Sequence, residues 1–208
     1  MYFPVLVLLI YVLAFVGYYY FAKAKNSLIV SAFSGVTTVL GHIRFNYKNS
    51  YFVLAREGHS SRYGGGGSHA VLWTLLQPTD EFTICTSKTR KYLYLFGFPK
   101  NHFEVEFDGV KLVFVSKSEE SLQKLRRAAG DTKLLQVLKA LLNRDFSYIK
   151  VSKEYYFLSQ IWPSRCFVLK YSYVNELVYK DISMLQAILD NINLLQTRLH
   201  LNHFNPVE

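Results

Sequence analysis

Two glutamates come nearest to a catalytic arrangement in this sequence. Glu104 and Glu106 lie two positions apart in a run that alternates charged and apolar residues. A strand would place both carboxylates on one face, and paired carboxylates can perform acid–base chemistry. The same alternation is the ordinary pattern of a strand with one solvated face. We therefore predict a polar strand face and no catalytic residue.

Histidines and glycines occur together between residues Glu57 and His69. Four consecutive glycines lie in this segment, but neither the P-loop pattern nor the GxGxxG pattern is present. The residues between His59 and His69 include no carboxylate or thiol that would complete a metal site. We expect a flexible connection between strands, no metal and no cofactor. His200 and His203 are likewise expected at the surface.

Cys85 and Cys166 are the only cysteines, and each lies within an apolar run. Without a CxxC motif or a nearby histidine they do not form a metal or redox site. We expect two buried thiols. A disulfide between them would require an exported domain.

The element that must position all of these residues is the N-terminal segment 1–22, which has no charged side chain. As a helix it would be about 33 Å long, close to the ~30 Å hydrocarbon layer of a bilayer. A cleavable signal peptide is disfavoured because no positive residue precedes the run and no small-residue cleavage site follows it. We predict a transmembrane anchor, with its contacts made by Leu6, Leu9, Leu13, Tyr18, Tyr19, Tyr20, Lys23 and Lys25.

The charges that flank the anchor predict its orientation. No Lys or Arg precedes it, whereas Lys23, Lys25, Arg44 and Lys48 follow it. The positive-inside rule then places the N-terminus outside and the C-terminal domain in the cytoplasm. Residues 28–43 also contain no Lys, Arg, Asp or Glu apart from their flanks, so a second membrane span is an alternative. We favour a helix that continues towards Phe33, with a first strand near residue 37.

The remaining 186 residues are enough for one domain with a substantial core. We predict a juxtamembrane segment at 23–36, a soluble domain at 37–200 and a tail at 201–208. The net charge of +9 lies outside the anchor. Such a domain could bind anionic lipid, nucleic acid or an acidic protein, or it could simply have a solvated basic surface.

Alternating segments predict an α+β fold with a mainly antiparallel sheet. Expected strands are 51–56, 70–77, 81–86, 92–96, 103–107, 110–115, 146–151, 155–159 and 166–173. Asp108-Gly109 predicts a type I′ hairpin turn, and the segment Ser152 to Glu154 predicts another turn. The helix pair and a C-terminal helix are expected to cover this sheet.

Three amphipathic helices are expected. Ser116 and Glu119 have capping-box spacing, Asp131 caps the second helix, and Asp181 caps a long C-terminal helix through which the chain could self-associate. The first two helices hold the densest basic cluster, a predicted contact for an anionic surface or a partner. Base-reading side chains are too few for us to favour nucleic acid. The cluster comprises Lys124, Arg126, Arg127, Lys133, Lys139 and Arg144.

Over most of residues 30–160, and most specifically at residues 103–120, the chain resembles a group of uncharacterised bacterial membrane-anchored proteins. The resemblance is carried by Phe107-Asp108, by the strand end Val113 to Ser116, and by the acidic helix start that follows. It departs from that group where His102-Phe103-Glu104 replaces a Gly-Asp pair. The resemblance implies a bacterial inner-membrane location and no particular activity.

These observations favour a non-catalytic, membrane-anchored subunit that binds a partner or scaffolds a membrane complex. Its expected partners are the lipid bilayer and other membrane-complex proteins. The alternative is a membrane-surface enzyme, or a domain that recognises an anionic lipid.

Overall fold

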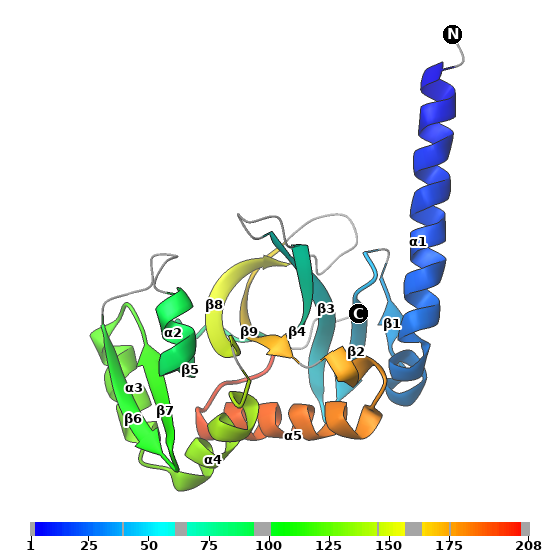
Figure 1. Cartoon of the computed structure of the whole chain (residues 1–208). Helices are drawn as coiled ribbons and strands as arrows, with labels where there is room; N and C mark the ends of the chain where they lie inside the picture. The colour runs from blue at the N-terminus through cyan, green and yellow to red at the C-terminus, as the bar shows by residue number, and fades with distance from the viewer. Residues whose placement is uncertain are drawn as a thin grey trace.

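The N-terminal helix α1 (Phe3–Phe33) is continuous through the predicted anchor and most of the juxtamembrane segment. The computed structural model describes residues 3–38, 40–60, 66–93, 101–144, 146–156, 164–174 and 176–204. Figure 1 shows the first half of α1 extending well beyond the rest of the molecule. The helix ends as predicted, with Ser34 at φ 50° and strand β1 beginning at Val36.

One antiparallel sheet forms the body of the protein. Nine strands occur in the described residues, in the order β1-β2-β3-β4-β9-β8-β5-β7-β6, and every pairing is antiparallel. The predicted sheet is therefore confirmed. The strands are β1 (Val36–Thr37), β2 (Ile43–Tyr47), β3 (Ser50–Ser60), β4 (Gly66–Leu76), β5 (Phe82–Thr86), β6 (His102–Phe107), β7 (Val110–Val115), β8 (Tyr148–Tyr156) and β9 (Ser164–Val174).

Three helices bury one face of this sheet. They are α3 (Glu119–Ala128), α4 (Thr132–Leu141) and α5 (Ile182–Arg198), and a 3₁₀ turn η2 (Glu176–Tyr179) leads into α5. Figure 1 shows α4 and α5 beneath the sheet. The main core unites their leucines with strand residues such as Phe52, Leu72 and Ile149, all essentially inaccessible to solvent. The predicted cover of a helix pair and a C-terminal helix is confirmed.

Caps explain where the helices begin. Asp131 accepts a hydrogen bond from the backbone N–H of Lys133, and Asp181 accepts one from Met184, as the sequence predicts. The cap of α3 is Ser118, which accepts from Ser121, so the capping box predicted at Ser116 is wrong. Ser116 instead donates to the carbonyl oxygen of Glu81 at 2.7 Å.

Two predicted strand boundaries are also wrong. The segment Ser87–Leu93 is a helix, α2, which includes the start of the strand predicted at 92–96; residues 94–96 lie outside the described part. Thr86 begins α2 by accepting a hydrogen bond from the N–H of Thr89. Strand β8 continues through the predicted turn because Ser152 and Glu154 lie on the same face, where the hydroxyl donates to the carboxylate at 2.8 Å.

The hairpin of β3 and β4 extends further than expected. Pairing continues from Phe52 opposite Thr74 to Ser60 opposite Gly66. The strands therefore include much of the connection predicted between Glu57 and His69, and residues 61–65 lie outside the described part. The predicted hairpin of β6 and β7 is confirmed, since Asp108 and Gly109 both have positive φ, at 50° and 77°.

Candidate functional site

Helix α1 is long and apolar enough to cross a membrane. Of its predicted anchor residues, the leucines and two of the three tyrosines are exposed to the surroundings of the protein, as are both lysines, while Tyr19 is half-buried. Leu13 is 62% exposed and Tyr20 is 65% exposed, which is unusual for apolar side chains in a packed domain. The exposed anchor side chains are Leu6, Leu9, Leu13, Tyr18, Tyr20, Lys23 and Lys25.

The second half of α1 packs on the domain. Asn26 and Ile29 are buried, and the ring of Phe33 lies 5.0 Å from that of Phe45, measured between centroids. The side-chain amide of Asn26 donates to the carbonyl oxygen of Gly41 at 3.0 Å. Because this half of α1 shares the core of the sheet, the exposed half is joined to the domain without a flexible linker.

The predicted basic cluster is partly neutralised. Lys124 makes ion pairs with Asp80 at 2.9 Å and with Glu120 at 3.1 Å, and Lys139 makes one with Asp108. Arg126 lies over the ring of Phe103 at 5.2 Å. The remaining members, Arg127, Lys133 and Arg144, are exposed. These residues are on α3, on α4 and just beyond α4, and in Figure 1 both helices lie away from α1.

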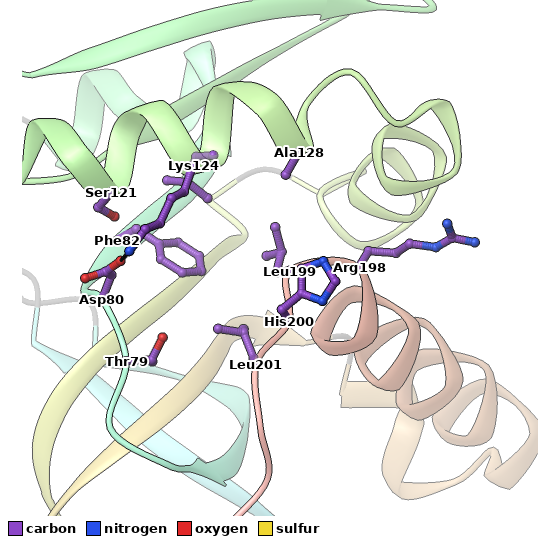
Figure 2. A pocket seen from close by; sticks show the side chains of 11 residues that line it. Thr79, Asp80, Phe82, Ser121, Lys124, Ala128, Arg198, Leu199, His200 and Leu201 are labelled. Carbon is purple, nitrogen blue, oxygen red and sulfur yellow. Dashed lines mark hydrogen bonds and ion pairs between the residues drawn. The ribbon is translucent and has the colours of Figure 1, made fainter.

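A cleft of about 280 Å³ lies between α3 and the end of α5. Figure 2 shows Lys124 reaching from α3 towards Asp80, with the ring of Phe82 beside them and Leu199 across the cleft. Thr79 and Ser121 add hydroxyl groups to the lining. The cleft combines apolar lining residues with an ion pair. This lining suits the docking of a small side chain from a partner better than it suits catalysis.

Charged residues also pair on the sheet face opposite the helices. The ammonium of Lys170 lies 2.8 Å and 2.9 Å from the two carboxylate oxygens of Glu57, and 5.2 Å from the centre of the Trp73 ring. Lys150 bonds Glu154 at 2.9 Å. Burial alone would raise the pKa of Glu154, but the hydrogen bonds from Lys150 and Ser152 outweigh burial and lower it. Both carboxylates are therefore partners of lysines.

Glu104 and Glu106 are on the edge strand β6, on the face that the sequence predicts. Glu104 accepts from Lys111 at 2.5 Å and from Arg90 at 3.2 Å. The hydrogen bond from Lys111 lowers the pKa of Glu104. Glu106 is exposed. A carboxylate bonded to two cations is a poor proton donor, so Glu104 is poorly suited to general-acid catalysis at neutral pH.

The histidines are dispersed. His69 lies opposite Glu57 in the β3–β4 pairing, and the side chain of His59 lies outside the described residues. His200 is exposed, as expected. His203 is not at the surface: it is half-buried, its Nε2 lies 3.1 Å from the hydroxyl of Ser50, and burial lowers its pKa. Among the residues that the structure describes, no three His, Cys, Asp or Glu side chains form a potential metal site.

Both cysteines are free thiols. Cys85 is fully buried, and burial raises its pKa to about 12. Cys166 is half-buried, and burial also raises its pKa. Neither is a reactive thiolate at neutral pH.

A second, smaller cavity lies at the foot of α1, where the helix meets the turn before β2. It is lined by Lys25, His42, Arg56 and Tyr179, among others. Of these residues the sequence analysis singled out only Lys25 as a site residue. The others come from segments distant in the sequence, and no local motif links them.

Comparison of the chain with protein-family models, with curated protein sequences and with solved structures found no match. These comparisons therefore provide no activity, ligand or partner to transfer.

Proposed function

We propose that this protein is a non-catalytic, membrane-anchored subunit that binds a partner or scaffolds a membrane-associated complex. The observation that carries the proposal is the division of α1 into an exposed apolar half and a half that shares the domain core. A helix of this kind would fix the orientation of the domain at a membrane surface. A fixed orientation is more useful to a complex subunit than to a diffusing enzyme.

The proposed topology has the N-terminus outside and the domain in the cytoplasm, because Lys23 and Lys25 follow the apolar half. The resemblance at residues 103–120 supports a bacterial inner membrane as the setting. The cleft between α3 and α5 is the surface we assign to a protein partner, because Lys124 and Asp80 give it a polar edge beside apolar side chains.

The enzyme alternative receives less support from the described side chains. Glu57, Glu104 and Glu154 are each bound to lysine, and in Glu104 and Glu154 this bonding lowers the pKa. A general acid at neutral pH would instead need a raised carboxyl pKa.

Detergent extraction of the tagged full-length protein from its native membrane tests the proposal. We expect one or a few proteins to remain with it at stoichiometric levels through size exclusion. A Lys124→Glu variant should lose them, and a Lys180→Glu variant, at an exposed lysine outside both the cleft and the basic cluster, should retain them. Recovery of the wild-type protein alone and monomeric would contradict the subunit proposal.

A further inference from the structure

The small cavity at the foot of α1, here called the α1-foot cavity, has a volume of about 60 Å³. A water molecule occupies about 30 Å³ in the liquid, so this volume is on the scale of one small polar group. A phosphate group, which has one phosphorus and four oxygen atoms, is of that kind.

Its lining carries positive charge. Lys25 and Arg56 provide this charge, His42 adds an imidazole whose pKa is lowered by burial and by the nearby Arg44, and no Asp or Glu lines the cavity. Among the described residues none of these three side chains makes an ion pair, whereas Lys48, Lys124, Lys150 and Lys170 are each paired with carboxylates. Two glutamates outside the lining act electrostatically on it, Glu57 on His42 and Glu176 on Tyr179; Glu57 also bonds Lys170, and Glu176 is exposed.

Arg56 is prepared for an anion. Its guanidinium lies over the ring of Tyr179 at 4.2 Å, and its buried Nε has no hydrogen-bond partner among the described residues. Stacking fixes the plane of a guanidinium while leaving the N–H groups at its edge available, and the fork of these groups matches phosphate oxygens. Because the Nε is inaccessible to a water-sized probe, contact with an anion in the cavity would be made by the terminal N–H groups of the guanidinium.

The depth of the α1-foot cavity matches the headgroup region of a bilayer. The segment of α1 from Phe3 to Ala22 is about 30 Å long, the thickness of the hydrocarbon layer. Tyr18 and Ala22 at its end both line the cavity. Leu40, on the adjoining turn, is 53% exposed and also lines the cavity, so it would lie beside lipid rather than water.

We propose that the α1-foot cavity binds the phosphate of an anionic phospholipid headgroup, with Arg56 and Lys25 as its cationic contacts and His42 as a neutral hydrogen-bonding neighbour. This inference depends on the proposed membrane anchoring. The net charge of the headgroup matters, because the choline of a zwitterionic lipid would meet the same cations that attract its phosphate.

The test uses the full-length protein in a neutral detergent. Its thermal midpoint is followed while dihexanoyl-phosphatidylglycerol, dihexanoyl-phosphatidylcholine or inorganic phosphate is added. We expect the anionic lipid to raise the midpoint and to bind at least tenfold more tightly than the other two. Equal stabilisation by phosphatidylcholine would overturn the assignment, and equal stabilisation by inorganic phosphate would show a site for free phosphate instead.

Variants locate the site. Lys25→Gln and Arg56→Gln should each weaken binding of the anionic lipid fivefold or more. Lys23→Gln is the matched control, because Lys23 is in the same region of α1 but lines a different cavity with Tyr19 and Ser27. Its affinity should stay within twofold of wild type. An equal loss in Lys23→Gln would mean general surface attraction and would overturn the proposal.

Two further measurements keep the outcomes distinct. If Arg56→Gln fails to fold, Arg56→Lys provides a second variant that retains the positive charge. It should bind the anionic lipid less tightly than wild type because the forked N–H donors of the guanidinium are lost. Wild-type affinity in both Arg56→Lys and Lys25→Gln would contradict the site. Membrane pelleting of the same proteins reports on anchoring separately: a chain that pellets but does not select the anionic lipid refutes only this inference.

Discussion

The side-chain amide of Asn26 donates a hydrogen bond to the carbonyl oxygen of Gly41, 15 residues away, at a distance of 3.0 Å. Asn26 is only 3% exposed, so this bond lies in the contact between α1 and the turn before β2. It connects the exposed apolar helix to the domain that this helix would hold at a membrane.

Removing this bond should loosen the foot of α1. Asn26→Ala leaves the part-buried carbonyl of Gly41 without its donor, and we expect the free energy of unfolding to fall by about 1 kcal/mol. Ser27→Ala is the control, because the hydroxyl of Ser27 bonds only its own helix at Ala24. Denaturant unfolding in detergent measures both. Equal stability of the two variants would contradict a structural role for Asn26.

Two glycines separate backbone strain from packing. Gly41 and Gly109 both have φ 77°, so an alanine is strained at either position. A Cβ at Gly41 would also lie 3.0 Å from the Tyr18 hydroxyl and 3.3 Å from the Ala22 Cβ, whereas a Cβ at Gly109 would meet nothing within 4 Å. We expect backbone strain to lower the free energy of unfolding of each alanine variant by about 1 kcal/mol, and that of Gly41→Ala to fall further because of the close contacts. Equal midpoints in thermal unfolding would show that α1 is not packed against this turn.

Stability should fall at alkaline pH. Burial raises the pKa of Cys85, of Tyr171 and of Tyr179 to about 12, from ordinary values of 9.0 for the thiol and 10.0 for the phenols. Between about pH 9 and 12 the unfolded chain has lost these protons while the folded chain retains them. Since the unfolded state then binds fewer protons, the free energy of unfolding decreases as pH rises.

Tyr171→Phe should weaken this dependence on pH. The variant also loses the 2.5 Å hydrogen bond from the Tyr171 hydroxyl to the carbonyl oxygen of Leu141, so it should be less stable than wild type at pH 8. Urea midpoints at pH 8 and pH 10.5 give the comparison. An unchanged difference between the two pH values would mean that Tyr171 does not contribute to the alkaline loss.

Asp131 combines two roles that can be separated. One carboxylate oxygen caps α4 by accepting from the N–H of Lys133, and the other pairs with Arg198 of α5 at 3.0 Å. We expect Asp131→Ala to lower the free energy of unfolding by about 1–2 kcal/mol. Asp131→Asn should lower it less, since the asparagine side chain can still cap α4. Both partners are about one-third exposed, so a double-mutant cycle with Arg198→Gln should give a coupling below about 1 kcal/mol. Equal losses in the two Asp131 variants would contradict the capping role.

The elements that could be predicted are those with local signals. Asp108-Gly109, Asp131 and Asp181 each fix an element end through their own side chain or backbone, and all three were predicted from neighbouring residues alone. The alternation of β8 was interrupted in the prediction because Ser152 to Glu154 resembles a turn. Only the sheet shows that these polar residues bond one another on its face opposite the helices.

The α1-foot cavity had no such local signal. His42, Arg56 and Tyr179 become neighbours through the packing of α1, β3 and η2, which brings together residues more than a hundred positions apart. The basic cluster on α3 and α4 was visible as a composition, but the sequence could not indicate that Asp80 and Asp108 would neutralise part of it. Charge density along a chain predicts basic residues, and the fold decides which of them remain unpaired.

The most direct test of the account is whether α1 anchors the protein in a bilayer. Membranes that contain the full-length protein should be washed with alkaline carbonate and then sedimented. We predict that the protein remains in the pellet, and that replacing Leu9 and Leu13 together by arginine releases it, because each charge at the centre of a span costs about 2.5–3.5 kcal/mol. Release of the wild-type protein into the supernatant would contradict the membrane anchor, and with it the proposed function.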